Sequence, residues 1–146
     1  MALLIYEDKP RYDTATKLTI IIIPTFCLFI AFQYPEPQLF AMAVVVLAVF
    51  WIIFPRRYQI FEDKLRVVLG KPFSFNIPFK TIKSVGAPQK IGFGMNWATS
   101  MTKRGVEITR KKRMNVFITP SDGDSFIENL NGALANWRKF HAEYKS

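Results

Sequence analysis

Two long hydrophobic runs dominate the first third of the chain. Residues 18–35 contain no charged side chain, nor do residues 37–55, and the one charge between the runs is Glu36. A helix needs roughly 20 mainly apolar residues to cross the ~30 Å hydrocarbon core of a bilayer. The pattern therefore predicts two transmembrane helices, at about residues 18–34 and 38–54. The connection between them is so short that they must form a hairpin with both ends on the same side.

Two other interpretations of these runs fit less well. Helices that are apolar on every face would be hard to bury in a soluble protein of 146 residues. A cleaved signal peptide would not be preceded by a polar segment of 17 residues and followed at once by a second run. Basic residues flank the hairpin and are missing from its turn: Lys9, Arg11, Lys17, Arg56 and Arg57. The positive-inside rule then predicts that both termini are cytoplasmic.

The periodicity changes after residue 55. Phe73, Phe75, Ile77 and Phe79 occupy every second position, which is typical of a strand with one buried face. Turn-forming residues recur about every 8–12 positions through this region and separate further short strands. Seven strands are predicted in all: two within 58–70, then 73–79, 82–87, about 93–99, 105–109 and 115–119. This spacing indicates a β-sandwich or a small barrel.

A helical pattern replaces the strands near the C-terminus. Apolar or aromatic residues recur three or four positions apart and form one stripe: Ile127, Leu130, Leu134, Trp137 and His141. Asp122 and Asp124 stand where helix caps are expected, which predicts a helix at about 122–144. The chain is therefore predicted to be an α+β membrane protein. Its parts are a cytoplasmic N-terminal segment (1–17), a transmembrane helical hairpin (18–55) and a cytoplasmic domain (56–146).

Three short motifs connect this domain with a known family. They are an Ile-Pro-x-x-x-Ile-x-x-Val element, a Gly-x-Gly, and an Ile-x-Pro that is followed by a Phe and a Leu: Ile77, Pro78, Ile82, Val85, Gly92, Gly94, Ile118, Pro120, Phe126 and Leu130. With these motifs, residues 56–135 resemble a bacterial pleckstrin-homology-like (PH-like) domain. The resemblance implies a seven-stranded, partly open β-barrel capped by the C-terminal helix, in a family where short membrane spans often precede the domain. It also implies a binding or scaffolding role rather than a reaction.

Charge is concentrated in the same region. Lys and Arg number 20 against 11 Asp and Glu, and residues 56–146 alone carry 17 basic and 7 acidic side chains. The densest run, Arg110–Arg113, is predicted to lie at the tip of a hairpin. It is interpreted as a solvated turn, as a contact with anionic lipid headgroups, or as a contact with a protein partner. Nucleic acid is not expected, because no nucleic-acid-binding fold accompanies the run. The candidate headgroup contacts are Arg56, Arg57, Arg110, Lys111, Lys112 and Arg113.

Residues with catalytic or metal-binding chemistry are sparse. Cys27 is the single cysteine and His141 the single histidine. Neither a zinc-type cluster nor an independent Ser/His/Asp set is therefore expected. The sequence predicts no catalytic residue, no metal and no cofactor, and a protein that is not an enzyme.

These patterns together predict a membrane-anchored PH-like binding or scaffolding module in the bacterial inner membrane. It would present an interaction surface to a protein partner, or to a second copy of the chain, at the cytoplasmic face. Two alternatives stay open. One is a domain that senses anionic lipid or another ligand, and the other is a non-catalytic accessory subunit of a membrane enzyme or transporter.

Overall fold

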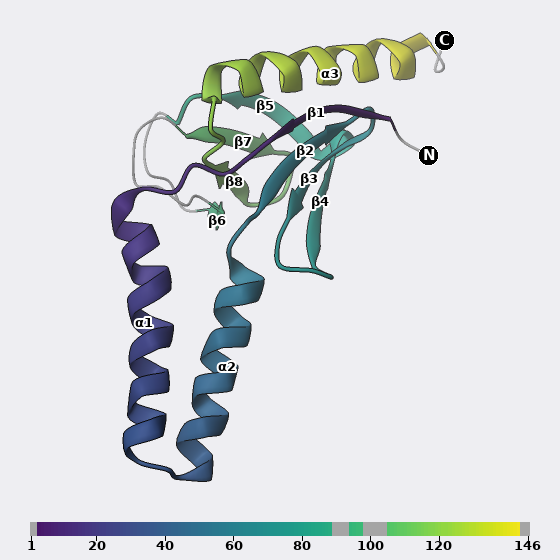
Figure 1. The fold of residues 1–146 in the computed structure, drawn as a ribbon. Coiled ribbons are helices and arrows are strands. Elements are labelled where there is room, and N and C mark those ends of the chain that lie inside the picture. Colours follow the sequence, from purple (N-terminus) through teal and green to yellow (C-terminus); the bar gives the residue numbers. More distant parts are fainter. Residues whose placement is uncertain (1–2, 89–93, 98–104, 144–146) are drawn as a thin grey trace.

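A helical hairpin projects from a domain of two β-sheets and a third helix (Figure 1). The computed structural model describes residues 3–88, 94–97 and 105–143. Helix α1 spans Thr14–Gln33 and helix α2 spans Pro37–Ile53, close to the predicted bounds. The turn that joins them lies at the end far from the domain, so both ends of the hairpin meet the domain (Figure 1).

Local signals explain where the hairpin helices begin. The Asp13 side chain accepts a hydrogen bond from the Thr16 amide at 2.7 Å and caps α1, and Pro37 opens α2. Pro24 lies inside α1 and is buried, and the helix continues through it. By length and composition, α1 could cross a membrane, whereas α2 is a shorter apolar helix of 17 residues.

The strands form two four-stranded sheets. The first has the order β1-β2-β3-β4 and is antiparallel throughout. The second has the order β5-β7-β8-β6, with β6 parallel to β8 at its edge. Their bounds are β1 Leu4–Asp8, β2 Arg57–Phe61, β3 Lys64–Val68, β4 Ser74–Pro78, β5 Ile82–Gly86, β6 Gly94–Trp97, β7 Val106–Arg110 and β8 Asn115–Ile118. A short 3-10 helix, η1 (Phe79–Thr81), connects β4 to β5. All seven predicted strands are present. They lie in two sheets that do not close into a barrel, which fits the sandwich that their spacing also allowed.

An eighth strand, β1, precedes the hairpin, in the segment where the sequence predicted only a cytoplasmic N-terminal extension. It pairs with β2, and Asp8 lies opposite Tyr58. Beyond β1, Pro10 forms an isolated bridge with Pro120. The domain therefore includes residues on both sides of the hairpin, and the two helices interrupt it between its first and second strands.

The core lies between the two sheets and helix α3 (Gly123–Glu143), which covers the side of the sheets away from the hairpin (Figure 1). Asp122 caps α3, because its carboxylate accepts hydrogen bonds from the amide and the hydroxyl of Ser125. Residues from every layer are almost wholly buried: Tyr58, Ile60, Leu65, Val67, Ile82, Val106, Ile108, Val116, Ile118, Phe126, Leu130 and Leu134.

One predicted core position is wrong. Phe73 was expected on the buried face of its strand, but it precedes β4 and is exposed. His141, at the end of the stripe on the last helix, is exposed and stacks on the Trp137 ring at a centroid distance of 4.2 Å. Other predictions lie outside the described residues: Gly92, the ends of the 93–99 strand and the last residue of the 122–144 helix.

Candidate functional site at the base of the domain

The hairpin and the domain are joined by contacts from both connecting segments. The Tyr12 hydroxyl donates to the Pro55 carbonyl, and the rings of Tyr12 and Phe54 lie 6.2 Å apart between centroids. The Arg11 amide donates to the Thr119 carbonyl at 2.8 Å. Burial raises the pKa of Tyr12, so its hydroxyl stays a neutral donor. These contacts hold the base of the domain in a defined position against the ends of both helices.

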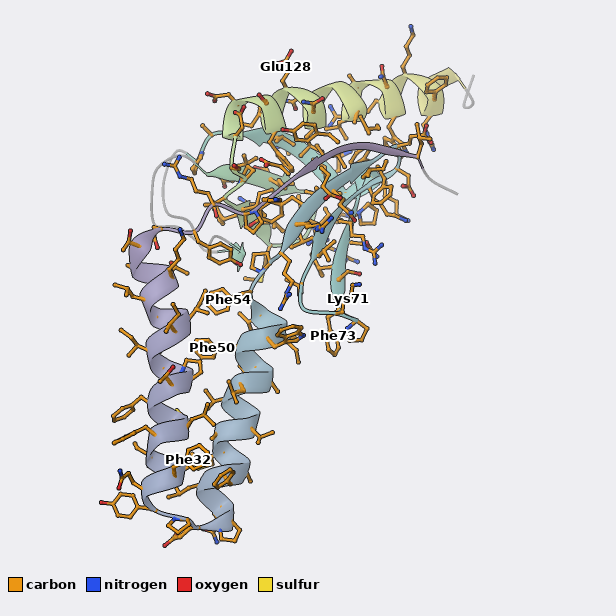
Figure 2. The ribbon with its side chains drawn as sticks, viewed as in Figure 1. Phe32, Phe50, Phe54, Lys71, Phe73 and Glu128 are labelled. Atoms are coloured by element: carbon orange, nitrogen blue, oxygen red, sulfur yellow. The ribbon has the colours of Figure 1, made fainter. Side chains whose placement is uncertain are left out.

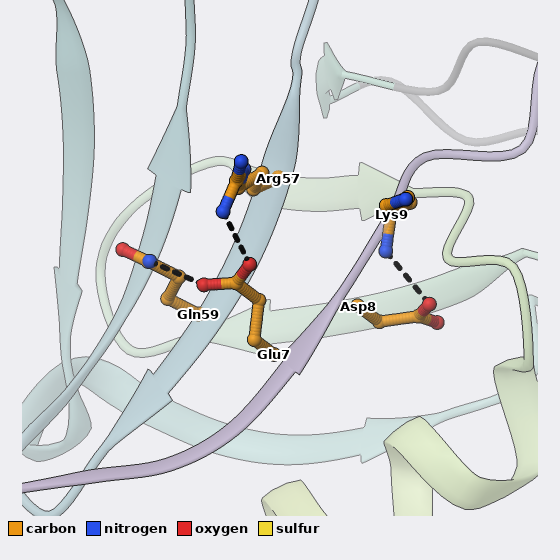
Figure 3. Close-up of polar contacts among 5 residues, drawn as sticks. All are labelled: Glu7, Asp8, Lys9, Arg57 and Gln59. Carbon is orange, nitrogen blue, oxygen red and sulfur yellow. Dashed lines mark hydrogen bonds and ion pairs between the residues drawn. The ribbon is translucent and has the colours of Figure 1, made fainter.

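Arg56 and Arg57, two of the predicted headgroup contacts, point to different neighbours. The Arg56 guanidinium lies 3.8 Å from the centroid of the Trp51 ring, in the last turn of α2. The Arg57 side chain is exposed and bonds to the Glu7 carboxylate at 2.8 Å, in a cluster that also includes Gln59 (Figure 3). Arg56 therefore belongs to the end of the hairpin, whereas Arg57 belongs to the outer face of the first sheet.

The basic run has the predicted hairpin-tip position, since β7 ends at Arg110 and β8 begins at Asn115. Lys111, Lys112 and Arg113 are exposed. Arg110 differs, because it continues the inward alternation of Val106 and Ile108 and is only 6% exposed. Only three of the four charges are thus available to a ligand at the surface.

The buried Arg110 guanidinium lies over an aromatic ring, 5.9 Å from the Phe75 centroid. Its Nε and Nη2 atoms have no hydrogen-bond partner within the described part of the chain. Burial, and then the nearby charge of Arg113, lowers the pKa of Arg110. Arg110 is therefore a charge enclosed by the sheets rather than a surface contact.

The structure does not bring the tip and the base of the domain together. Lys111 donates its amide to Thr81, just beyond the end of β4. The other end of β4, Ser74, pairs with Val68, whose carbonyl accepts from the Arg56 amide. The five residues of β4 span about 13 Å at ~3.3 Å per residue. The tip and Arg56 thus lie near opposite ends of β4.

A different segment lies beside the hairpin, and the sequence did not single it out. The turn between β3 and β4, residues 69–73, reaches the last turn of α2, where Figure 2 labels Lys71 and Phe73. A Cβ added at Gly70 would lie 2.1 Å from the Trp51 carbonyl oxygen. Phe73 was missed because its spacing fits the buried face of β4. A lysine and a proline directly before it were the available sign of a turn.

A hollow of about 690 Å³ lies at the start of α3, lined by Arg11, Gly105, Ser121, Asp122 and Asp124 among others. Hydrogen bonds from Ser125 lower the pKa of Asp122, whose carboxylate is occupied in capping the helix. Across the described ranges, no three His, Cys, Asp or Glu side chains are grouped so that they could hold a metal ion. The Asp122 carboxylate that lines the hollow is therefore already engaged within the protein.

The fold and its motifs agree with a comparison of the chain against protein families. The model of the bacterial PH domain matches residues 56–133, which is more than half of the chain. The chain belongs to the bacterial PH domain family. No match was found among curated proteins or among solved structures. The matched range begins just after the hairpin, so β1 and both helices lie outside it.

Proposed function

We propose that this chain is an integral membrane protein whose hairpin anchors a PH domain as a non-catalytic binding or scaffolding module. The observation that carries the proposal is the exposure of large apolar side chains along the whole hairpin. Among them are Leu18, Ile21, Ile22, Phe26, Phe29, Phe32, Met42, Val44, Val45 and Trp51. Apolar surface in water costs roughly 25 cal/mol per Å², and a bilayer removes this cost.

The same arrangement supports a cytoplasmic domain. Both hairpin ends meet the domain (Figure 1), and the basic residues are on that side, at Lys9, Arg11, Lys17 and Arg56. The far turn, Tyr34–Glu36, has no basic residue. The positive-inside rule then orients the domain toward the cytoplasm of a bacterial inner membrane.

A binding role is proposed from the family and from the direction in which the domain faces. PH domains are in general binding and scaffolding modules, and here α3 lies on the side away from the hairpin (Figure 1). A domain held in this way would present α3 and the neighbouring sheet surfaces to a cytoplasmic protein or to the cytoplasmic part of a membrane protein.

Membrane extraction and cysteine labelling test the anchor. In a Cys27→Ala background, Gln38→Cys reports on the far end of the hairpin and Met114→Cys on the β7–β8 turn. We expect the protein to stay in bacterial membranes after alkaline carbonate extraction. An impermeant maleimide added to spheroplasts should label position 38, and position 114 only after permeabilisation. Release by carbonate, or labelling of both positions from one side, would contradict the anchor.

Purification in mild detergent tests the binding role. A scaffold should retain one protein partner at a fixed ratio, whatever lipid is added during purification. A chain that is purified without any partner and forms no oligomer in detergent would argue against scaffolding.

A further inference from the structure

The β3–β4 turn has a fixed depth relative to α2. The Phe73 amide donates to the Gly70 carbonyl at 2.8 Å, and the Leu69 amide donates to the Phe73 carbonyl at 3.1 Å, which closes the turn. Gly70 is buried against the backbone and ring of Trp51, in the last turn of α2. Wherever the end of α2 lies in a bilayer, this turn must lie at the same level.

The side chains around this contact are aromatic or cationic, and they are exposed. Trp51 is 54% exposed and Phe73 is 49% exposed. Lys71, two residues before Phe73, is exposed as well. Figure 2 shows Lys71 and Phe73 beside the top of α2, and the Arg56 guanidinium covers one face of the Trp51 ring. Two aromatic rings and two cations thus surround the point where the hairpin enters the domain.

We propose that Trp51, Arg56, Lys71 and Phe73 form an interfacial patch that binds the headgroups of anionic phospholipids. This proposal rests on the membrane anchor proposed above and specifies what the base of the domain binds. Tryptophan is enriched at the level of the headgroups, and lysine and arginine extend their charged ends toward phosphates while their stems stay in apolar surroundings. The Lys71 and Arg56 cations therefore bind phosphate, while the Phe73 and Trp51 rings lie at the edge of the hydrocarbon.

Lipid is a better occupant of this patch than a protein partner. The patch is continuous with the exposed apolar surface of α2, which only a bilayer covers along its whole length. The Gly70–Trp51 contact prevents the turn from swinging away to meet a partner in the cytoplasm. The exposed cations of the β7–β8 turn lie near the opposite end of β4 and are not part of the patch.

Spin labels measure the depth of the patch in the full chain in lipid nanodiscs. Phe73→Cys is compared with Met114→Cys, an exposed apolar residue in the other turn, both in a Cys27→Ala background. Native Cys27, inside α1, is the reference for the hairpin. We expect oxygen to relax the labels at 27 and 73 more than a soluble nickel chelate does, and the reverse at 114.

The outcomes separate the patch from the anchor. A label at 27 shielded from nickel, with one at 73 as accessible to nickel as at 114, overturns the patch and leaves the anchor in place. A label at 27 open to nickel overturns both. Shielding of position 73 from oxygen as well as from nickel would mean that protein covers it, and would also overturn the patch.

A second experiment tests the lipid charge. Spin-labelled phosphatidylglycerol and phosphatidylcholine report the relative association of each lipid with the chain, for wild type, Lys71→Gln and the matched control Lys112→Gln. One cation near an anionic surface is worth about 1 kcal/mol, or about fivefold at 1.4 kcal/mol per tenfold. We expect Lys71→Gln to lower the preference for phosphatidylglycerol about fivefold, and Lys112→Gln to leave it unchanged. Loss in the control alone, or in neither variant, overturns the proposal.

Discussion

At Gly70 the domain and the hairpin approach each other closely. A methyl group there would meet the carbonyl oxygen of Trp51 at 2.1 Å and its ring at 2.6 Å. The carbonyl belongs to the backbone of α2 and cannot rotate away, so any side chain at position 70 must move the turn or the helix end. Glycine is thus required here by close approach rather than by an unusual backbone angle.

Replacing Gly70 with alanine should therefore destabilise the domain. Added atoms in a tightly packed site cost about 1–3 kcal/mol, so the thermal unfolding midpoint in detergent, followed by circular dichroism, should fall. Gly132→Ala is the matched control, because Gly132 lies in α3 with no atom near its added methyl group. That change should raise stability by about 0.5–1 kcal/mol. Equal effects at the two positions would contradict the close contact.

The Glu7 carboxylate should make stability depend on pH. The hydrogen bond from Gln59, at 2.6 Å, and then the bond from Arg57 hold the pKa of Glu7 below its ordinary value of 4.5 (Figure 3). The stabilisation is present above the unfolded pKa and is lost as pH falls through the lower folded pKa. Glu7→Gln should therefore lower the unfolding midpoint at pH 7, with a difference that shrinks below about pH 4.5. A difference that is the same at every pH would show that the charge is not responsible.

Single residues also show the limits of sequence patterns. The alternation through residues 73–79 predicted a buried Phe73, and the charge run predicted four similar cations at 110–113. Both rules consider only neighbours along the chain. Phe73 is exposed because its turn packs against Trp51 through Gly70, a contact between distant segments that local spacing does not show. Arg110 is buried because it continues the inward alternation of Val106 and Ile108, a local signal that the run of four cations obscured.

Among the elements, α3 joins the two sides of the interrupted domain. Phe126 packs edge-to-face on Tyr6 of β1 and on Tyr58 of β2, with centroid distances of 6.1 Å in both cases. The helix and the seven strands after the hairpin were predictable, because each has a strong period of its own. β1 was not, because it is a short strand whose partner lies some 50 residues further along the chain.

Phe126→Ala should therefore be one of the most damaging substitutions in the domain. Removal of a fully buried phenylalanine costs about 3–5 kcal/mol, and here the rings of two strands lose their common neighbour. Phe140→Ala, on the same helix but 70% exposed, should change stability by no more than about 0.5 kcal/mol. Denaturant unfolding monitored by near-ultraviolet circular dichroism checks both. A mild effect at Phe126 would mean that α3 does not pack as described.

In the whole molecule, the helical hairpin connects β1 and β2, two antiparallel neighbours that a tight turn could otherwise join. Asp8 and Tyr58 face each other in the β1–β2 pair, and the 49 residues between them form the hairpin and its two connections. The sequence predicted the hairpin and the domain as separate, consecutive parts, since nothing local shows that residues 4–8 complete a sheet. A chain that begins at residue 56 lacks β1 and leaves β2 as an unpaired edge.

This arrangement predicts that the domain folds without a membrane if β1 is kept. Residues 9–57 would be replaced by Asn-Gly, which favours the two-residue turn that joins antiparallel strands. We expect this joined chain to be a water-soluble monomer with one cooperative unfolding transition. Residues 58–146 alone are the control. This control lacks the Tyr6–Phe126 ring contact and the pairing of β1 with β2. Its thermal unfolding midpoint should therefore be about 10–20 °C below that of the joined chain, or the control should aggregate. If the control were as stable as the joined chain, β1 would be an accessory strand and the hairpin would precede the domain rather than interrupt it.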